Sequence, residues 1–212
     1  MSTDSLDRRH ERVDRIVDLA TVILISLAAL GTAWCSYQSA RWSALQALNY
    51  SKANAARVEA SAYADRANAH RVVDVLVFAE YIRAIDDRES YASFIRSRFD
   101  PALERAVKAW LATDPLHNPK APRTPFVMGA YHLPEEDQTR EGATAANAFV
   151  EAAVSANEIS DSYLFLTVLF AAASFLGGIA IKLRRPTHVA AACVGVVIFV
   201  IALAIMLRYP IR

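Results

Sequence analysis

The sequence predicts an all-α integral membrane protein with three transmembrane helices and an extracytoplasmic helical stalk and head. Three stretches, residues 19–40, 162–181 and 186–207, contain no Lys, Arg, Asp or Glu. Each is long enough to cross a bilayer as a helix, which takes about 20 apolar residues. In addition, neither Gly nor Pro occurs between Thr32 and Asp100. Because Gly and Pro are the poorest helix formers, the first span is expected to continue out of the membrane unbroken.

The spans divide the chain unequally, with nearly all the polar mass between the first and the second. The expected segments are a cytoplasmic N-terminal segment (1–18), span one (19–40), an extracytoplasmic insert (41–161), span two (162–181), a cytoplasmic turn (182–187), span three (188–207) and an extracytoplasmic tail (208–212).

Basic residues set the expected orientation, because cytoplasmic flanks of spans are enriched in Lys and Arg. They cluster before the first span and after the second, at Arg8, Arg9, Arg12, Arg15, Lys182, Arg184 and Arg185. The N-terminus is therefore expected inside the cytoplasm and the C-terminus outside it. A removable signal peptide is the alternative, with 31–33 as its cleavage site. The acidic residues of the leader and the length of the apolar run favour an anchor.

Within the insert, residues 37–69 are rich in alanine and 135–161 return towards the membrane. At 1.5 Å per residue these helices would reach about 50 Å and 40 Å, which suits an antiparallel stalk. Residues 72–111 are richer in large apolar side chains and are expected to form a small head. The polar run 86–90 interrupts its helices, and Asp100-Pro101 is typical of an N-cap followed by proline at the first helical position.

The returning helix shows a 3-4 alternation of apolar or small residues, which predicts a seam packed against another helix. The expected seam positions are 145, 149, 152, 156, 159, 163, 166, 170, 173, 177 and 180.

Residues 114–134 form a proline-rich strap with five prolines in 21 residues. Proline disfavours both helix and central strand, so an extended, polyproline-like path is expected. One interpretation has the strap cross the head and bury its apolar side chains, among them Leu116, Phe126, Val127, Met128 and Tyr131. The other makes it a docking surface for an envelope protein. Its candidate interaction residues are Pro119, Pro122, Pro125 and Phe126.

A second group of candidate interaction residues follows the first span at the base of the stalk: Tyr37, Gln38, Arg41 and Trp42. The expected partners are the lipid bilayer and either further copies of this chain or another envelope protein. The insert holds 14 basic and 17 acidic residues. A nearly neutral surface of this kind argues against nucleic acid as a partner.

No pattern in the sequence indicates catalysis, a cofactor or a metal. The spans hold no residue that is charged at neutral pH, whereas transporters usually carry functional ionisable groups there. His117 and His132 flank the strap without a metal-ligand spacing and are interpreted as surface residues. His70 and Asp74 lie four apart on one helix face and are interpreted as a local side-chain pair.

A family resemblance covers nearly the whole chain. It rests on the run Trp34–Trp42, on Asp114-Pro115, Asn118-Pro119, Ala121-Pro122 and Thr124-Pro125-Phe126, and on the basic turn after the second span. With these features the chain resembles a group of uncharacterised bacterial membrane proteins with one span, a helical extracytoplasmic segment and a closely spaced pair of spans. The resemblance implies this topology, a location in the bacterial cytoplasmic membrane and no activity.

These observations favour a non-catalytic interaction, scaffold or accessory subunit of the cell envelope that acts through its insert. One alternative is a sensor or regulatory subunit, since the topology is similar to that of bacterial chemoreceptor sensor regions. This chain lacks their cytoplasmic signalling domain, so a sensor of this kind would need a partner. The second alternative is a component of an oligomeric channel.

Overall fold

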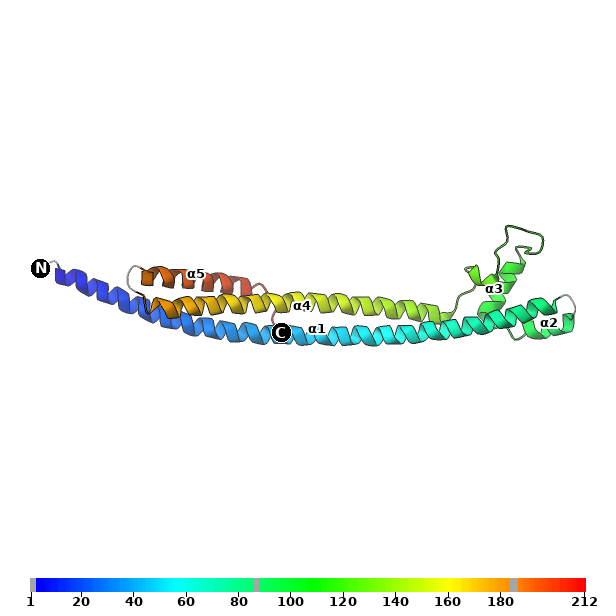
Figure 1. Cartoon of the computed structure of the whole chain (residues 1–212), viewed down its shortest axis with the longest axis horizontal. Coiled ribbons are helices and arrows are strands. Elements are labelled where there is room, and N and C mark those ends of the chain that lie inside the picture. Colours follow the sequence, from blue (N-terminus) through cyan, green and yellow to red (C-terminus); the bar gives the residue numbers. More distant parts are fainter. Residues whose placement is uncertain (1–2, 86–87, 184–186) are drawn as a thin grey trace. The chain divides into compact units, whose positions relative to one another are not determined.

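The computed structural model describes residues 3–85, 88–183 and 187–212, and the described residues contain helices and no strand (Figure 1). The predicted all-α fold class is confirmed. In chain order the elements are α1 (Thr3–Ala84), α2 (Glu89–Arg96), α3 (Pro101–Leu111), the 3₁₀ turn η1 (Pro125–Val127), α4 (Pro134–Ala180) and α5 (Thr187–Met206).

Three of these helices, α1, α4 and α5, are long and apolar enough to cross a membrane, which indicates a membrane protein. As expected, α1 continues without a break far beyond the first apolar run. The second apolar run forms the C-terminal part of α4, and the third forms α5. Arg184 and Arg185 of the expected basic turn lie outside the described residues.

The chain divides into two compact units, which are described separately here. We call residues Met1–Tyr50 with Val150–Arg212 the spanning unit, and Ser51–Phe149 the insert unit.

In the spanning unit, small residues bring the helices close together. A Cβ added to Gly31 of α1 would lie 2.9 Å from the Phe170 ring of α4, and one added to Gly177 of α4 would lie 2.9 Å from Ile25. A Cβ added to Gly195 of α5 would lie 3.3 Å from the Leu24 side chain. Such small-residue contacts are the usual means of helix packing in lipid, where no hydrophobic effect drives helices together.

The seam of α4 follows the expected spacing at Ala156 and from Tyr163 onwards, but three earlier positions are shifted by one residue. The structure buries Ala146, Ala153 and Ser160, whereas Ala145 and Ala152 are exposed. The sequence could not show which of two adjacent alanines faces the seam. At the third position, Ile159 was expected inside because it is more apolar than Ser160. Ser160 is inside because its hydroxyl hydrogen-bonds the hydroxyls of Ser39 and Ser43, at 3.0 and 2.9 Å.

In the insert unit, the C-terminal part of α1 shares a hydrophobic core with α2 and α3. Its buried residues are Tyr81, Ala84, Ala92, Ile95, Leu103 and Val107. The predicted N-cap is confirmed: the Asp100 carboxylate accepts hydrogen bonds from the Ala102 and Leu103 amides, with Pro101 at the first helical position. The break between α1 and α2 falls where the polar run was expected, although Asp86 and Asp87 lie outside the described residues.

The strap is a series of turns, so the expected extended polyproline path is wrong. Hydrogen bonds join Asn118 N to Asp114 O (2.9 Å), Ala121 N to Asn118 O (3.0 Å) and Tyr131 N to Met128 O (3.0 Å). The Asn118 side chain also accepts from Lys120 N, a local contact that favours turns. Proline suits turns as well as extended chain, so proline content alone could not decide between them.

Candidate functional site: a buried carboxyl cluster in the insert unit

The site is built around Asp74, an ionisable residue at a buried position of α1. Within the insert unit, buried residues of α1 recur every seven positions, at Ala53, Ala60, Ala67, Asp74 and Tyr81. Repeats of seven place residues on one helix–helix seam. Asp74 is only 4% exposed. A carboxyl group at such a core position costs stability unless partners satisfy it.

The side chains gathered around Asp74 come from α1, the start of α3 and the end of the strap. The Tyr131 hydroxyl, at the end of the strap, donates a hydrogen bond to Asp74 Oδ2 at 2.8 Å. The carboxyl group of Asp100, the N-cap of α3, lies beside that of Asp74, with one oxygen of each within 4.8 Å of the other. His70, one turn before Asp74 on α1, places Nε2 2.9 Å from Asp100 Oδ2. The fold thus gathers two carboxyls, an imidazole and a phenol.

The pKa values of the two carboxyl groups shift in opposite directions. Burial raises the pKa of Asp74 above its ordinary value, and the neighbouring Asp100 adds to this rise. Burial would also raise the pKa of Asp100, but the Leu103 amide, the Asp74 carboxyl and the Ala102 amide outweigh it and lower that pKa. Asp100 is therefore the anion of the pair, and Asp74 is the group that more readily keeps a proton.

Tyr131 is fixed from several sides. Burial, followed by the hydrogen bond to Asp74, raises its pKa above the ordinary value, so the phenol stays a donor. Its ring packs edge-on against Phe126 with centroids 5.0 Å apart. The Arg71 guanidinium lies 5.9 Å from the ring centroid and forms an ion pair with Glu136 of α4.

His70, Asp74 and Asp100 each offer one potential metal-ligand atom, and these atoms lie within 4.8 Å of one another. The interpretation of His70 and Asp74 as a local pair is incomplete, because both converge on Asp100 from another helix. The sequence signal was an Asp in an otherwise small and apolar heptad row. Tyr131 and Asp100 could not be found from spacing, since they are 57 and 26 positions from Asp74.

The candidate interaction residues after the first span divide between two faces of α1. Gln38 and Trp42 are buried, at 0% and 8% exposure, whereas Tyr37 is 52% exposed and Arg41 is exposed. Gln38 Oε1 accepts a hydrogen bond from Arg212 N at 2.9 Å, and the Arg212 guanidinium lies 5.0 Å from the Trp42 ring. Gln38 and Trp42 therefore make contacts within the chain, and a partner-binding role stays a prediction for Tyr37 and Arg41.

The candidate residues of the strap divide in the same way. Pro119 is exposed, Pro122 and Phe126 are half-buried, and Pro125 is buried. The Trp110 indole donates to Pro122 O at 2.7 Å, and Phe126 packs edge-on against Phe78. The expectation that the strap buries all its apolar side chains is only partly met, because Leu116 and Val127 are 85% and 71% exposed.

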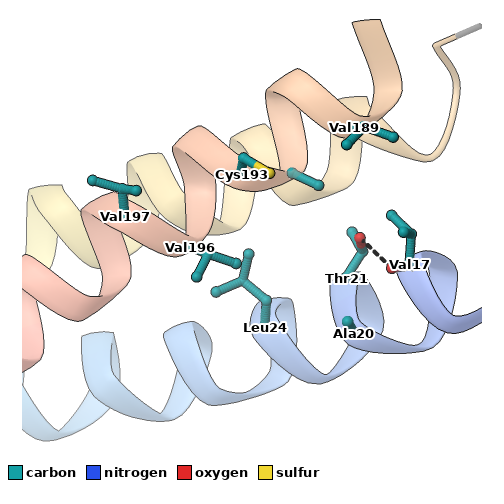
Figure 2. A pocket seen from close by; sticks show the side chains of 9 residues that line it. Val17, Ala20, Thr21, Leu24, Val189, Cys193, Val196 and Val197 are labelled. Carbon is teal, nitrogen blue, oxygen red and sulfur yellow. Dashed lines mark hydrogen bonds between the residues drawn. The ribbon is translucent and has the colours of Figure 1, made fainter. Parts of the chain in front are cut away.

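The spanning unit contains an apolar groove of about 350 Å³ between α1 and α5 (Figure 2). Leu24 on α1 and Val189, Cys193 and Val196 on α5 are among its lining residues. Its one hydroxyl, on Thr21, donates to Val17 O of its own helix at 2.7 Å. The lining residues carry no charged group and are almost all apolar, so the chemistry of the groove suits an acyl chain.

Comparison with protein-family models, curated proteins and solved structures gives no match to this chain.

Proposed function

We propose that the protein is a non-catalytic accessory or scaffold subunit of a bacterial cell envelope. In this proposal three helices anchor it in the cytoplasmic membrane, with the N-terminus inside, and the insert unit lies outside the cytoplasm. The basic residues that flank the spans support this orientation. The insert unit then binds another protein through the outer face of α1.

The observation that carries the proposal is a second apolar row on α1, opposite the buried seam. Val58, Val72 and Leu76 are 71%, 59% and 65% exposed. The complete row has 3-4 spacing and consists of Val58, Ala62, Asp65, Ala69, Val72, Leu76 and Ala79. Such a row is typical of a helix that packs against another helix. Large apolar side chains that are exposed outside the spans, here Val58, Val72 and Leu76, support an interaction surface.

Asp65 favours a different protein over a second copy as the occupant. Copies anchored in one membrane share their orientation, so a two-fold pair would place the same residues opposite each other. Two Asp65 carboxylates would then face each other in an apolar seam, which is unfavourable. The proposed partner is therefore an amphipathic helix of another envelope protein with Lys or Arg opposite Asp65. Tyr37, Arg41 and Pro119 are candidates for secondary contacts.

Site-specific photocrosslinking in intact cells tests the proposal. A photoreactive residue at Val72 or Leu76 should yield the same heterologous adduct from both positions. Arg66 is the matched control, because it is exposed on the same helix outside the row. Asp65→Lys should abolish the adduct by opposing the partner's charge. Self-adducts alone, strengthened by Asp65→Asn, would replace the proposal with homo-oligomerisation, and no adduct above the Arg66 control would remove it.

A sensor or regulatory subunit is the second candidate, and the buried carboxyl cluster favours it. A cluster that binds a proton or an ion in the insert unit can change the stability of that unit. Such a sensor predicts a ligand-dependent change in protection of the insert unit from hydrogen exchange, and a pure scaffold predicts none.

A further inference from the structure

We propose that His70, Asp74 and Asp100 form a binding site for a divalent transition-metal ion, with Zn²⁺ as the ion of choice. The inference does not depend on the partner proposed above, because it rests only on contacts inside the insert unit.

The three potential ligand atoms lie close to the spacing that such an ion requires. Metal–ligand bonds of roughly 2.0–2.2 Å place neighbouring ligand atoms about 3–3.6 Å apart. His70 Nε2 and Asp100 Oδ2 are 2.9 Å apart, and all three ligand atoms lie within 4.8 Å of one another. Small side-chain rotations therefore suffice to enclose an ion. The backbone elements that carry the ligands, α1 and the N-terminus of α3, already meet there.

Only one of the two Asp100 carboxylate oxygens caps α3, so the other is available to a metal ion. Oδ1 accepts the Ala102 and Leu103 amides at 2.5 and 2.9 Å and so caps α3. Oδ2 is buried and has no hydrogen-bond partner that meets normal geometry among the described residues, although His70 Nε2 is near. A buried carboxylate oxygen without such a bond requires a cation or a proton. This unsatisfied atom lies where His70 and Asp74 converge, so a cation bound there would satisfy it.

Tyr131 supplies the outer shell that a metal site needs. Its hydroxyl donates to Asp74 Oδ2, which orients the carboxylate and leaves Oδ1 or a second lone pair for the ion. Edge-on packing against Phe126 holds the phenol ring in place.

The site can be reached from solvent because the His70 side chain is 37% exposed. Three protein ligands leave at least one coordination position for water. The donor set also selects the metal. Imidazole nitrogen is a poor ligand for Mg²⁺ and Ca²⁺, whereas one imidazole with two carboxylates suits Zn²⁺ or Mn²⁺, and zinc binds more tightly of these two.

Metal binding has to release protons, because the carboxylates and the imidazole coordinate in their deprotonated forms. The affinity for Zn²⁺ should therefore rise with pH, and bound Zn²⁺ should protect α3 and the facing turn of α1 from opening.

The test uses the untagged full chain in lipid nanodiscs, freed of metal with a chelator and titrated with Zn²⁺ by calorimetry. One Zn²⁺ per chain is expected. Asp74→Asn, Asp100→Asn and His70→Gln should each lower the affinity by at least about 100-fold, and Tyr131→Phe by about 10–100-fold. Asn is also a good N-cap residue, so weaker Zn²⁺ binding by Asp100→Asn would not result from the loss of the α3 N-cap.

Two histidine variants control for surface binding. His117→Gln removes an exposed histidine beside Asp114, and His132→Gln removes the histidine that contacts Glu136 and Asp137. Both should keep the Zn²⁺ site, and hydrogen exchange should show zinc-dependent protection around residues 68–78 and 98–106. Either of two results would overturn the inference: no stoichiometric Zn²⁺, or binding that follows His117 or His132 and survives Asp74→Asn and Asp100→Asn. Asp74 and Asp100 would then be a carboxyl pair that binds no metal ion.

Discussion

Replacing Tyr131 with phenylalanine removes a single hydroxyl from the carboxyl cluster while the ring stays. Tyr131 is 6% exposed, and its hydroxyl donates to a carboxyl group that is itself 4% exposed. Since the ring keeps its contacts with Phe126, the variant creates almost no cavity. The cost is that of leaving a buried acceptor with one partner fewer, about 1–3 kcal/mol.

The magnitude should depend on pH. Where Asp74 keeps its proton, the lost bond is between neutral groups and is worth about 0.5–1.5 kcal/mol. Where Asp74 is ionised, the bond is to a charged acceptor and is worth about 1.5–3 kcal/mol. The destabilisation by Tyr131→Phe should therefore grow as pH rises through the folded-state pKa of Asp74.

Hydrogen exchange on the full chain in metal-free nanodiscs measures this loss locally. Because about 1.4 kcal/mol corresponds to a factor of ten, amides of the first turn of α3 should exchange about 5–150-fold faster, after correction for intrinsic rates. Tyr91→Phe is the matched control, since that side chain is 39% exposed in the same unit. Equal exchange in the two variants at every pH would refute the reasoning that Tyr131 satisfies a buried carboxyl group.

Three further predictions concern the same two units. Burial raises the folded-state pKa of Asp74, so its contribution to stability is full below the unfolded pKa and is lost as pH rises through the folded one. In metal-free denaturation, Asp74→Asn should therefore become increasingly stable relative to the parent as pH rises, and parallel pH profiles would contradict this. Gly142→Ala would place a Cβ 2.9 Å from the Cβ of Ala60 and should cost about 1–2 kcal/mol in hydrogen exchange, with recovery when combined with Ala60→Gly. In detergent titrations Gly177→Ala should destabilise the spanning unit, whereas Gly178→Ala, whose added Cβ meets nothing within 4 Å, should be neutral or stabilising by up to about 1 kcal/mol; equal effects would contradict the packing described for α4.

Local chemistry was enough to predict the helices from the sequence. Uncharged runs of spanning length, the absence of Gly and Pro after Thr32, and the capping pair Asp100-Pro101 all act within one or a few turns. The structure bears them out as α1, the N-cap of α3 and three apolar helices. The strap was misjudged because proline restricts φ and removes a donor, which is compatible with turns and with extended chain alike.

The carboxyl cluster could not be predicted because its members meet only through tertiary packing. His70 and Asp74 were visible as neighbours on one helix, but the partner that gives them chemistry, Asp100, was identified only as a helix cap. The seam register was wrong at three positions before Tyr163, one of them for a related reason. Ser160 occupies an inside position that polarity argued against, since its hydroxyl partners Ser39 and Ser43 lie more than a hundred positions away.

The central claim is that three spanning helices present the insert unit outside the cytoplasm. It is tested most directly by labelling single cysteines, in a background with Cys35 and Cys193 replaced, with a thiol reagent that does not cross membranes. Lys120→Cys in the exposed strap should be labelled in intact cells, and Lys182→Cys after α4 only after lysis. Labelling of Lys182→Cys in intact cells, with Lys120→Cys reached only after lysis, would contradict the account.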